Sequence, residues 1–194
     1  MALLIAGTAK ASISTAEGDE VITEIVGPGY AARLLVALGH AETGREITTL
    51  DPVEALSISS RHLCHLVETR PAITAACLQV VADQHAAANA ERERFAATCI
   101  TQRVAHRVLE LADGWGVPEG DVVRIALPLS QEGLTAWSGA SRESVANELQ
   151  SMRISGLITT GRRTLTVLDP MRLHERYARQ APDDDLRSLL PAQT

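Results

Sequence analysis

Three polar side chains that could read base edges stand close together in the segment SRESVANELQ: Arg142, Glu143 and Asn147. A guanidinium can donate two hydrogen bonds to guanine O6 and N7, a carboxylate can accept one from cytosine N4, and a carboxamide can pair with adenine N6 and N7. Each good pair contributes about 1–3 kcal/mol of discrimination between bases. Because Ser141 precedes them as a helix cap, all three would project from the first turns of one helix. We therefore predict that they contact base edges of double-stranded DNA.

Hydroxyl and guanidinium groups around this helix could bind the DNA backbone, which positions a protein without reading sequence. The candidates are Ser141, Ser144, Arg153, Arg162 and Arg163. The two serines could instead serve as caps, and the three base-edge candidates could instead be solvated residues of a helix start. The net charge of −6 does not favour nucleic-acid binding, so the hypothesis depends on the local clustering of arginines.

Two helices joined by a tight turn would position these side chains. The first would begin after Ser130 and bury Leu134 and Trp137. Gly139 stands where the chain must turn with positive φ, and Gly156 would end the second helix as its C′ residue. The buried face of the second helix would be formed by Val145, Leu149 and Met152. Its outward polar face would carry Arg142, Glu143, Ser144, Asn147, Glu148 and Ser151.

Two short β-branched runs, at 157–159 and 164–168, flank Gly161-Arg162-Arg163 and predict a hairpin after the second helix. Helix, turn, helix and hairpin in this order predict a winged helix-turn-helix. The stretch LPLSQEGLTAWSGASRESV…LQSMRISGLI…RRTLTVLDPMRL resembles the C-terminal domain of the Crp/Fnr family of bacterial transcription regulators. The resemblance extends from about Leu3 to Leu173 and is stronger from Arg103 onward.

The family usually carries aspartate where Cys99 stands, so we expect Thr98 or Thr101 to cap the helix that follows, and a looser hinge between domains.

Residues 2–58 alternate short β-favouring runs with turn signals such as Gly27-Pro28-Gly29, which predicts antiparallel β structure. These runs resemble the later strands of the jelly-roll in which the family holds a cyclic nucleotide. A complete roll of that kind would have further strands ahead of Met1, so we expect the chain as given to be N-terminally shortened.

A long helix is predicted from Pro71 toward Thr98, with proline at its first position. This helix carries two apolar stripes, and their combined width is greater than a coiled-coil seam requires. One stripe could therefore pack on the roll and the other on a second copy. The proposed dimer residues are Ile73, Cys77, Val80, Leu78 and Val81. The alternative is an ordinary core helix of a monomer.

The predicted fold is α+β, with a partial antiparallel β jelly-roll, a long dimerisation helix and a C-terminal winged helix-turn-helix. The corresponding parts are a cyclic-nucleotide-binding-like roll at 1–70, the dimerisation helix at 71–98, the DNA-binding domain at 99–178 and a flexible acidic tail at 179–194. No apolar run is long enough to cross a membrane, and the start MALLIAGTAK is too short for a secretory signal. We therefore expect the protein in the cytoplasm.

The resemblance implies an effector pocket, but this chain departs from the family's motif at each position. The family's Gly-Glu-Leu, which holds the ribose, is replaced by Ala32-Arg33-Leu34, and its Arg-Ser or Arg-Thr, which holds the phosphate, by Thr43-Gly44-Arg45. Where the helix of a partner copy reaches the nucleotide with hydroxyls, this chain has Ala88-Asn89. We therefore expect a degenerate pocket around Arg33, Arg45 and Asn89, with weakened or absent dependence on cyclic AMP. Arg45 could still be a displaced phosphate ligand, or both arginines could be solvated loop residues.

Enzymatic function is the alternative from another class, and the sequence lacks its usual motifs: GxSxG, the P-loop and HExxH. Cys64, Cys77 and Cys99 are too widely spaced for a disulfide framework or an iron-sulfur cluster, and His62 and His65 have no further ligands for a metal. Cys99 at the hinge could act as a redox switch. No metal or other cofactor is predicted.

The sequence thus predicts a homodimeric regulator that binds a palindromic operator, with its two recognition helices about 34 Å apart. The resemblance also implies RNA polymerase as a partner. Two alternatives remain open: a cyclic-nucleotide-responsive regulator, and a truncated, dimer-forming antagonist that binds DNA poorly.

Overall fold

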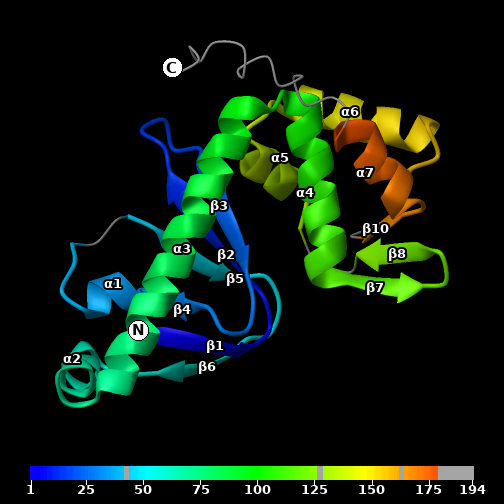
Figure 1. Ribbon diagram of the computed structural model, residues 1–194. Helices are drawn as coiled ribbons and strands as arrows, with labels where there is room; N and C mark the ends of the chain where they lie inside the picture. Colours follow the sequence, from blue (N-terminus) through cyan, green and yellow to red (C-terminus); the bar gives the residue numbers. More distant parts are fainter. Residues whose placement is uncertain (42–43, 126–128, 162–163, 179–194) are drawn as a thin grey trace, which may run out of the picture. The chain divides into compact units, whose positions relative to one another are not determined.

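The structure is a computed structural model that describes residues 1–41, 44–125, 129–161 and 164–178 (Figure 1). Contacts divide the chain into two compact units. The first comprises Met1–Glu91 and Pro128–Ala140, and the second comprises Arg92–Leu127 and Ser141–Thr194. The fold is α+β, with antiparallel sheets in both units, as the sequence predicts.

Two small antiparallel sheets form the roll of the first unit. One has the strand order β4 (Ala31–Ala32), β1 (Ala2–Ala6), β6 (Glu54–Ser57), and the other β3 (Glu20–Val26), β2 (Ala9–Ser14), β5 (Glu46–Thr49). A core of Leu4, Ala9, Val26 and Ala32 lies between them, with Ile47 packed against it. The β-favouring runs predicted within residues 2–58 therefore form strands, whereas β4 was not expected.

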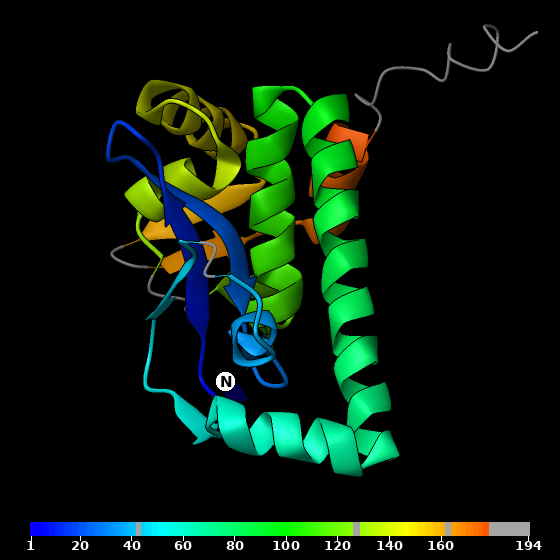
Figure 2. The same ribbon diagram turned by 90° about the vertical axis from the view of Figure 1, so that its left-hand side faces the viewer.

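Three helices accompany the roll: α1 (Leu34–Ala37), α2 (Ser60–Thr69) and α3 (Pro71–Ala97), which continues to the second unit (Figure 2). Ser59 caps α2, since its Oγ accepts a hydrogen bond from the backbone N–H of His62 at 3.3 Å. A second core, made of Ala31, Leu34, Ala37 and Leu63, supports α3. Helix α5 (Gln131–Ser138) also belongs to this unit and neighbours β3.

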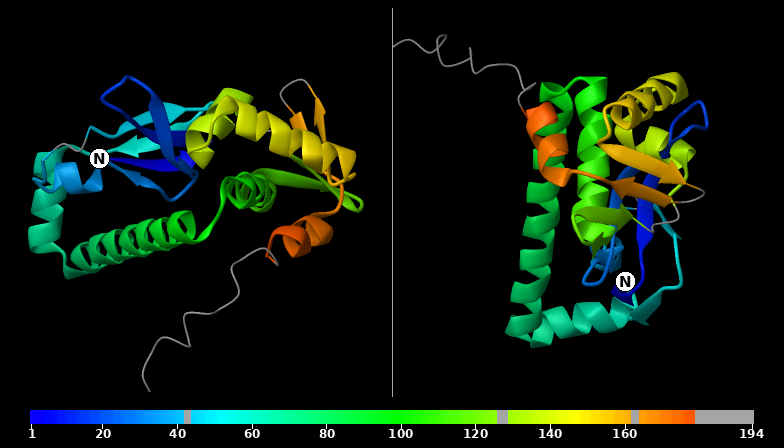
Figure 3. Two further views of the ribbon diagram at one scale, coloured as in Figure 1. Left: turned by 90° about the horizontal axis from the view of Figure 1, so that it is seen from above. Right: turned by 90° about the vertical axis from the view of Figure 1, so that its right-hand side faces the viewer.

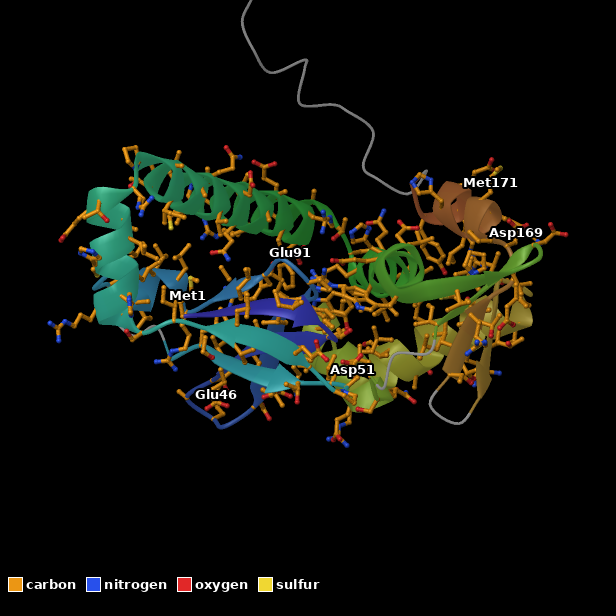
Figure 4. The ribbon with its side chains drawn as sticks, turned by 90° about the horizontal axis from the view of Figure 1, so that it is seen from below. Met1, Glu46, Asp51, Glu91, Asp169 and Met171 are labelled. Carbon is orange, nitrogen blue, oxygen red and sulfur yellow. The ribbon has the colours of Figure 1, made fainter. Side chains whose placement is uncertain are left out.

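The second unit consists of α4 (Ile100–Trp115), α6 (Arg142–Ile154), α7 (Pro170–Ala178) and a four-stranded sheet. The strand order is β7 (Gly116–Glu119), β8 (Val122–Ile125), β10 (Thr164–Val167), β9 (Ile158–Gly161). Helices α6 and α7 both pack on α4 (Figure 3). Asp169 caps α7, since its Oδ1 accepts from the Arg172 N–H at 2.8 Å; Figure 4 labels Asp169 and Met171 at the start of this helix.

The segment at the end of α4 contains Gly114, Gly116 and Pro118, residue types that often end a helix. The helix continues through Gly114 and ends at Trp115, and the next four residues form β7. Pro118 lies opposite Val123 on this strand. Because β7 is the edge of the sheet, the missing N–H of proline leaves no ladder bond unmade.

The cap at the corner between α3 and α4 is Cys99 rather than Thr98 or Thr101, which corrects the expected cap. Cys99 is itself the N-cap residue, and its N–H donates to Gln102 Oε1 at 2.9 Å. The guanidinium of Arg103 lies 4.1 Å from the centroid of the Phe95 ring and donates to the carbonyl oxygens of Phe95 and Thr98 at 3.4 and 3.3 Å. These bonds satisfy carbonyls that the end of a helix leaves exposed.

Candidate nucleic-acid interface

The cap of α6 determines where its first turn begins. Ser141 has an extended backbone, its Oγ accepts from the Ser144 N–H at 3.1 Å, and the two hydroxyls are hydrogen-bonded at 2.9 Å. Glu143 lies in the first turn, where a negative charge interacts favourably with the helix dipole. The capping alternative is thus realised for Ser141, which remains exposed at the rim of the helix.

The predicted buried face of α6 is confirmed. Val145 and Met152 are 0% exposed and Leu149 is 7% exposed, so this face packs fully within the protein. Arg142, Glu143 and Asn147 are all exposed. The structure therefore brings the three base-edge candidates together on the solvent side of one capped helix.

Two residues assigned to that polar face lie elsewhere, which corrects the sequence-based assignment. Glu148 is 9% exposed and accepts a hydrogen bond from the hydroxyl of Tyr177. Ser151 is half-buried and accepts from Arg176. Helical spacing alone could not separate these two positions from the solvent-facing side, because the helix that covers them comes much later in the chain.

Arg153, a predicted backbone ligand, joins α6 to the wing. Its Nη1 donates to Thr160 Oγ1 on β9 at 2.9 Å, and its Nη2 donates to Gln150 Oε1. Strands β9 and β10 form the predicted hairpin, while Arg162 and Arg163, between them in the sequence, lie outside the described residues. Gln150 is exposed on α6 and was not singled out from the sequence.

The predicted turn and the first helix are also confirmed. Ser130 caps α5 by accepting from the Gly133 N–H at 3.1 Å, Leu134 and Trp137 are buried, and Gly139 has φ 59°. A Cβ at Gly133 would meet the side chain of Leu129.

The effector candidates lie in three different parts of the chain: before α1, before β5 and on α3. Arg33 is exposed at the start of α1 with φ 60°, and Asn89 on α3 is hydrogen-bonded to His85 at 3.0 Å. Arg45 is already engaged: its Nη2 donates to Thr23 Oγ1 at 3.0 Å and to Glu24 Oε2 at 2.8 Å.

Tyr30 lies close to this ion pair. Burial raises the pKa of its phenol, the charge of Arg45 lowers it, and the charge of Glu24 raises it. The surroundings of Arg45 therefore already contain a carboxylate that neutralises its charge.

Helix α3 carries the proposed dimer residues. None of its 27 residues is fully buried in the single chain. Cys77, Val80 and Val81 are partly buried against the second core of the roll, whereas Ile73 and Leu78 are 36% and 66% exposed. The five residues thus divide between a side that packs on the roll and a side that faces solvent.

Known proteins resemble this chain along most of its length. Residues 102–176 match the family of Crp-like helix-turn-helix domains. Over 174 residues the chain is 28% identical to the CRP-like cAMP-activated global transcriptional regulator of Mycobacterium tuberculosis, covering 90% of this chain and 78% of that protein. It is 23% identical over 178 residues to the global nitrogen regulator of Synechococcus elongatus, covering 91% of this chain and 80% of that one.

Solved structures share the fold. A CRP-family transcriptional regulator from Thermus thermophilus has a TM-score of 0.76 at 22% identity, covering 93% of this chain and 88% of that one. The c-di-GMP responsive global regulator CLP of Xanthomonas campestris has a TM-score of 0.74 at 18% identity, covering 86% and 83%. The relatives are transcription regulators rather than enzymes. Within the described part of the chain, no helix is long and apolar enough to cross a membrane.

Proposed function

Because this chain belongs to the Crp/Fnr family of transcription regulators, we propose that it reads a palindromic operator as a homodimer, with Arg142, Glu143 and Asn147 at the base edges. The observation that carries the proposal is the exposure of these three side chains on α6 while Val145 and Met152 are fully buried. A capped helix with one buried and one polar side can enter the major groove with the polar side inward.

Backbone contacts are assigned to Ser141, Ser144 and Arg153, and to Arg162 and Arg163, which stand between β9 and β10 in the sequence. Arg153 supports this role because its bonds to Thr160 and Gln150 hold the guanidinium between α6 and β9. Such contacts would fix the orientation of α6 on the duplex without selecting a sequence.

The dimer is assigned to α3, within residues 71–98, between the roll at 1–70 and the DNA-binding domain at 99–178. Support comes from the apolar side chains that the single chain leaves uncovered, notably Ile73 and Leu78. A symmetric pair would place two copies of α6 about one helical turn apart on a palindrome, roughly 34 Å. RNA polymerase is a further partner on the basis of family membership.

Dependence on cyclic AMP is proposed to be weak or absent, although the Mycobacterium tuberculosis relative is described as cAMP-activated. Support comes from the Arg45–Glu24 ion pair, because a phosphate approaching Arg45 would meet the Glu24 carboxylate. Calorimetry with cyclic AMP tests this point: a stoichiometric heat accompanied by a shift in DNA affinity would contradict it.

The experiment for DNA reading is in vitro selection of bound duplexes, followed by affinity measurements for Arg142→Ala and Glu143→Ala. Each variant is expected to lose about 1–3 kcal/mol of preference for the selected palindrome over random duplex. Arg61→Ala is the matched control, because Arg61 is an exposed arginine on α2. Unchanged preference in both variants would contradict the assignment, and a chain that dimerises but shifts no duplex would favour the antagonist.

A further inference from the structure

A polar contact between α6 and α7 lies on the flank of the reading helix. Glu148, Ser151 and Ser155 recur at spacings of three and four residues, so they occupy one side of α6. The hydroxyl of Tyr177 donates to the Glu148 carboxylate, and Arg176 donates to Ser155 Oγ at 2.5 Å and Ser151 Oγ at 3.3 Å. We call these five residues the α6–α7 latch.

Burial makes the partners of Glu148 important. Glu148 is 9% exposed and Tyr177 is 6% exposed, so water does not solvate this carboxylate as it would at the surface. A buried carboxylate without a hydrogen-bond donor is costly. The guanidinium of Arg176, 5.4 Å from the centroid of the Tyr177 ring, adds a positive charge next to the pair. The latch therefore has a donor and a counter-charge in place for its buried anion.

The direction of these bonds determines the rotation of α6 about its axis. Val145, Leu149 and Met152 hold the helix by apolar contacts, which depend on area and hardly on angle. Hydrogen bonds weaken steeply when donor and acceptor are misaligned. One residue corresponds to about 100° of helix rotation, so a turn by only a fraction of that angle already moves the Arg142 and Asn147 side chains away from the base edges.

The C-terminal helix is a suitable anchor for this purpose. Helix α7 packs on α4, the helix that also supports α6, and Leu173 of α7 is 0% exposed. Arg176 and Tyr177 are thus presented from an element that is itself fixed in the core of the second unit. The latch connects two helices that share one support (Figure 3).

We propose that Arg176 and Tyr177 are positioning residues for DNA recognition, which hold α6 at the rotation that presents Arg142, Glu143 and Asn147 to the base edges. The inference rests on the proposed function, since it concerns the precision of the same reading helix. It adds the C-terminal helix to the residues that determine specificity, without assigning α7 any contact with a base.

The test compares Tyr177→Phe, which removes only the hydroxyl, with the Ser151→Ala/Ser155→Ala double variant, which removes both acceptors of Arg176. His174→Gln, an exposed position on α7, is the control. Hydrogen exchange is measured first, without DNA. Amides of residues 147–155 should exchange roughly tenfold faster in both latch variants, while those of α4 and of the control stay at the wild-type rate. Unchanged exchange along α6 would overturn the latch whatever the chain binds.

DNA binding provides the second measurement. Both latch variants should lose about tenfold in affinity for the selected palindrome and keep wild-type affinity for random duplex, because phosphate contacts tolerate a rotated helix. Wild-type discrimination in both variants would overturn the positioning role. If the wild-type chain itself fails to discriminate, the proposed function fails, and the exchange data still decide whether the latch exists. Should Tyr177→Phe not fold, the serine variant alone carries both measurements.

Discussion

Leu78 offers a sharp test of the dimer helix, since it is the most exposed of the five proposed dimer residues, at 66%. Full burial of a leucine side chain contributes about 1.5–3 kcal/mol. Burying the exposed two thirds of Leu78 in a dimer would therefore contribute about 1–2 kcal/mol of association free energy for each copy. Leu78→Ala changes both copies, so the dimer should weaken by about 2–4 kcal/mol, or roughly 30- to 700-fold in Kd.

The substitution leaves the helix itself intact, because alanine is the best helix former. Sedimentation velocity over a dilution series measures the dissociation constant of the wild type and the variant. The matched control is Leu56→Ala: Leu56 is 63% exposed, but it lies on strand β6 rather than on α3.

Two results would refute the reasoning. Wild-type dimerisation of Leu78→Ala would mean that another surface joins the copies. An equal loss in Leu56→Ala would mean that the effect follows exposed apolar area in general and not the face of α3.

The remaining predictions concern stability. Burial, and then the hydrogen bond to Glu148, raises the pKa of Tyr177 above its ordinary value of 10.0, so the folded chain keeps a proton that the unfolded chain releases. This contribution to the free energy of unfolding is fully present below about pH 10 and is lost as the pH rises further. Denaturant titrations at several pH values should show this fall for the wild type and a smaller fall for Tyr177→Phe. The same dependence on pH in both proteins would contradict the prediction. Gly7→Ala should lower the Tm more than the control Gly18→Ala does. Both glycines have positive φ, at 84° and 89°, but only at Gly7 would a Cβ overlap the Pro52 carbonyl oxygen. Equal shifts in Tm would refute this reasoning.

Local chemistry made much of the recognition motif predictable. Ser130 and Ser141 cap their helices with their own hydroxyls, and Gly139 and Gly156 take positive φ, at 59° and 66°. Each of these features involves only residues within a few positions along the chain, so the residue types themselves encode them. The exposed and buried sides of α6 followed from helical spacing for the same reason, apart from the flank that α7 covers.

The features that sequence reasoning missed depend on residues brought together from distant parts of the chain. Pro118 could enter a strand only because β7 is the edge of its sheet, and Arg45 is neutralised by a carboxylate 21 residues earlier. Cys99 is a cap without a classical capping side chain because Gln102 reaches back to it.

By itself, the amino-acid sequence determined most of the helices and strands, where the reading helix begins and ends, and which side chains on it are suited to base edges. Only the tertiary structure decided that Glu148 is a buried anion held by Tyr177, 29 residues later, rather than another solvent-facing group. The physical reason is that caps, turns and helical spacing are short-range, whereas burial of a charge depends on which distant donor the fold places beside it.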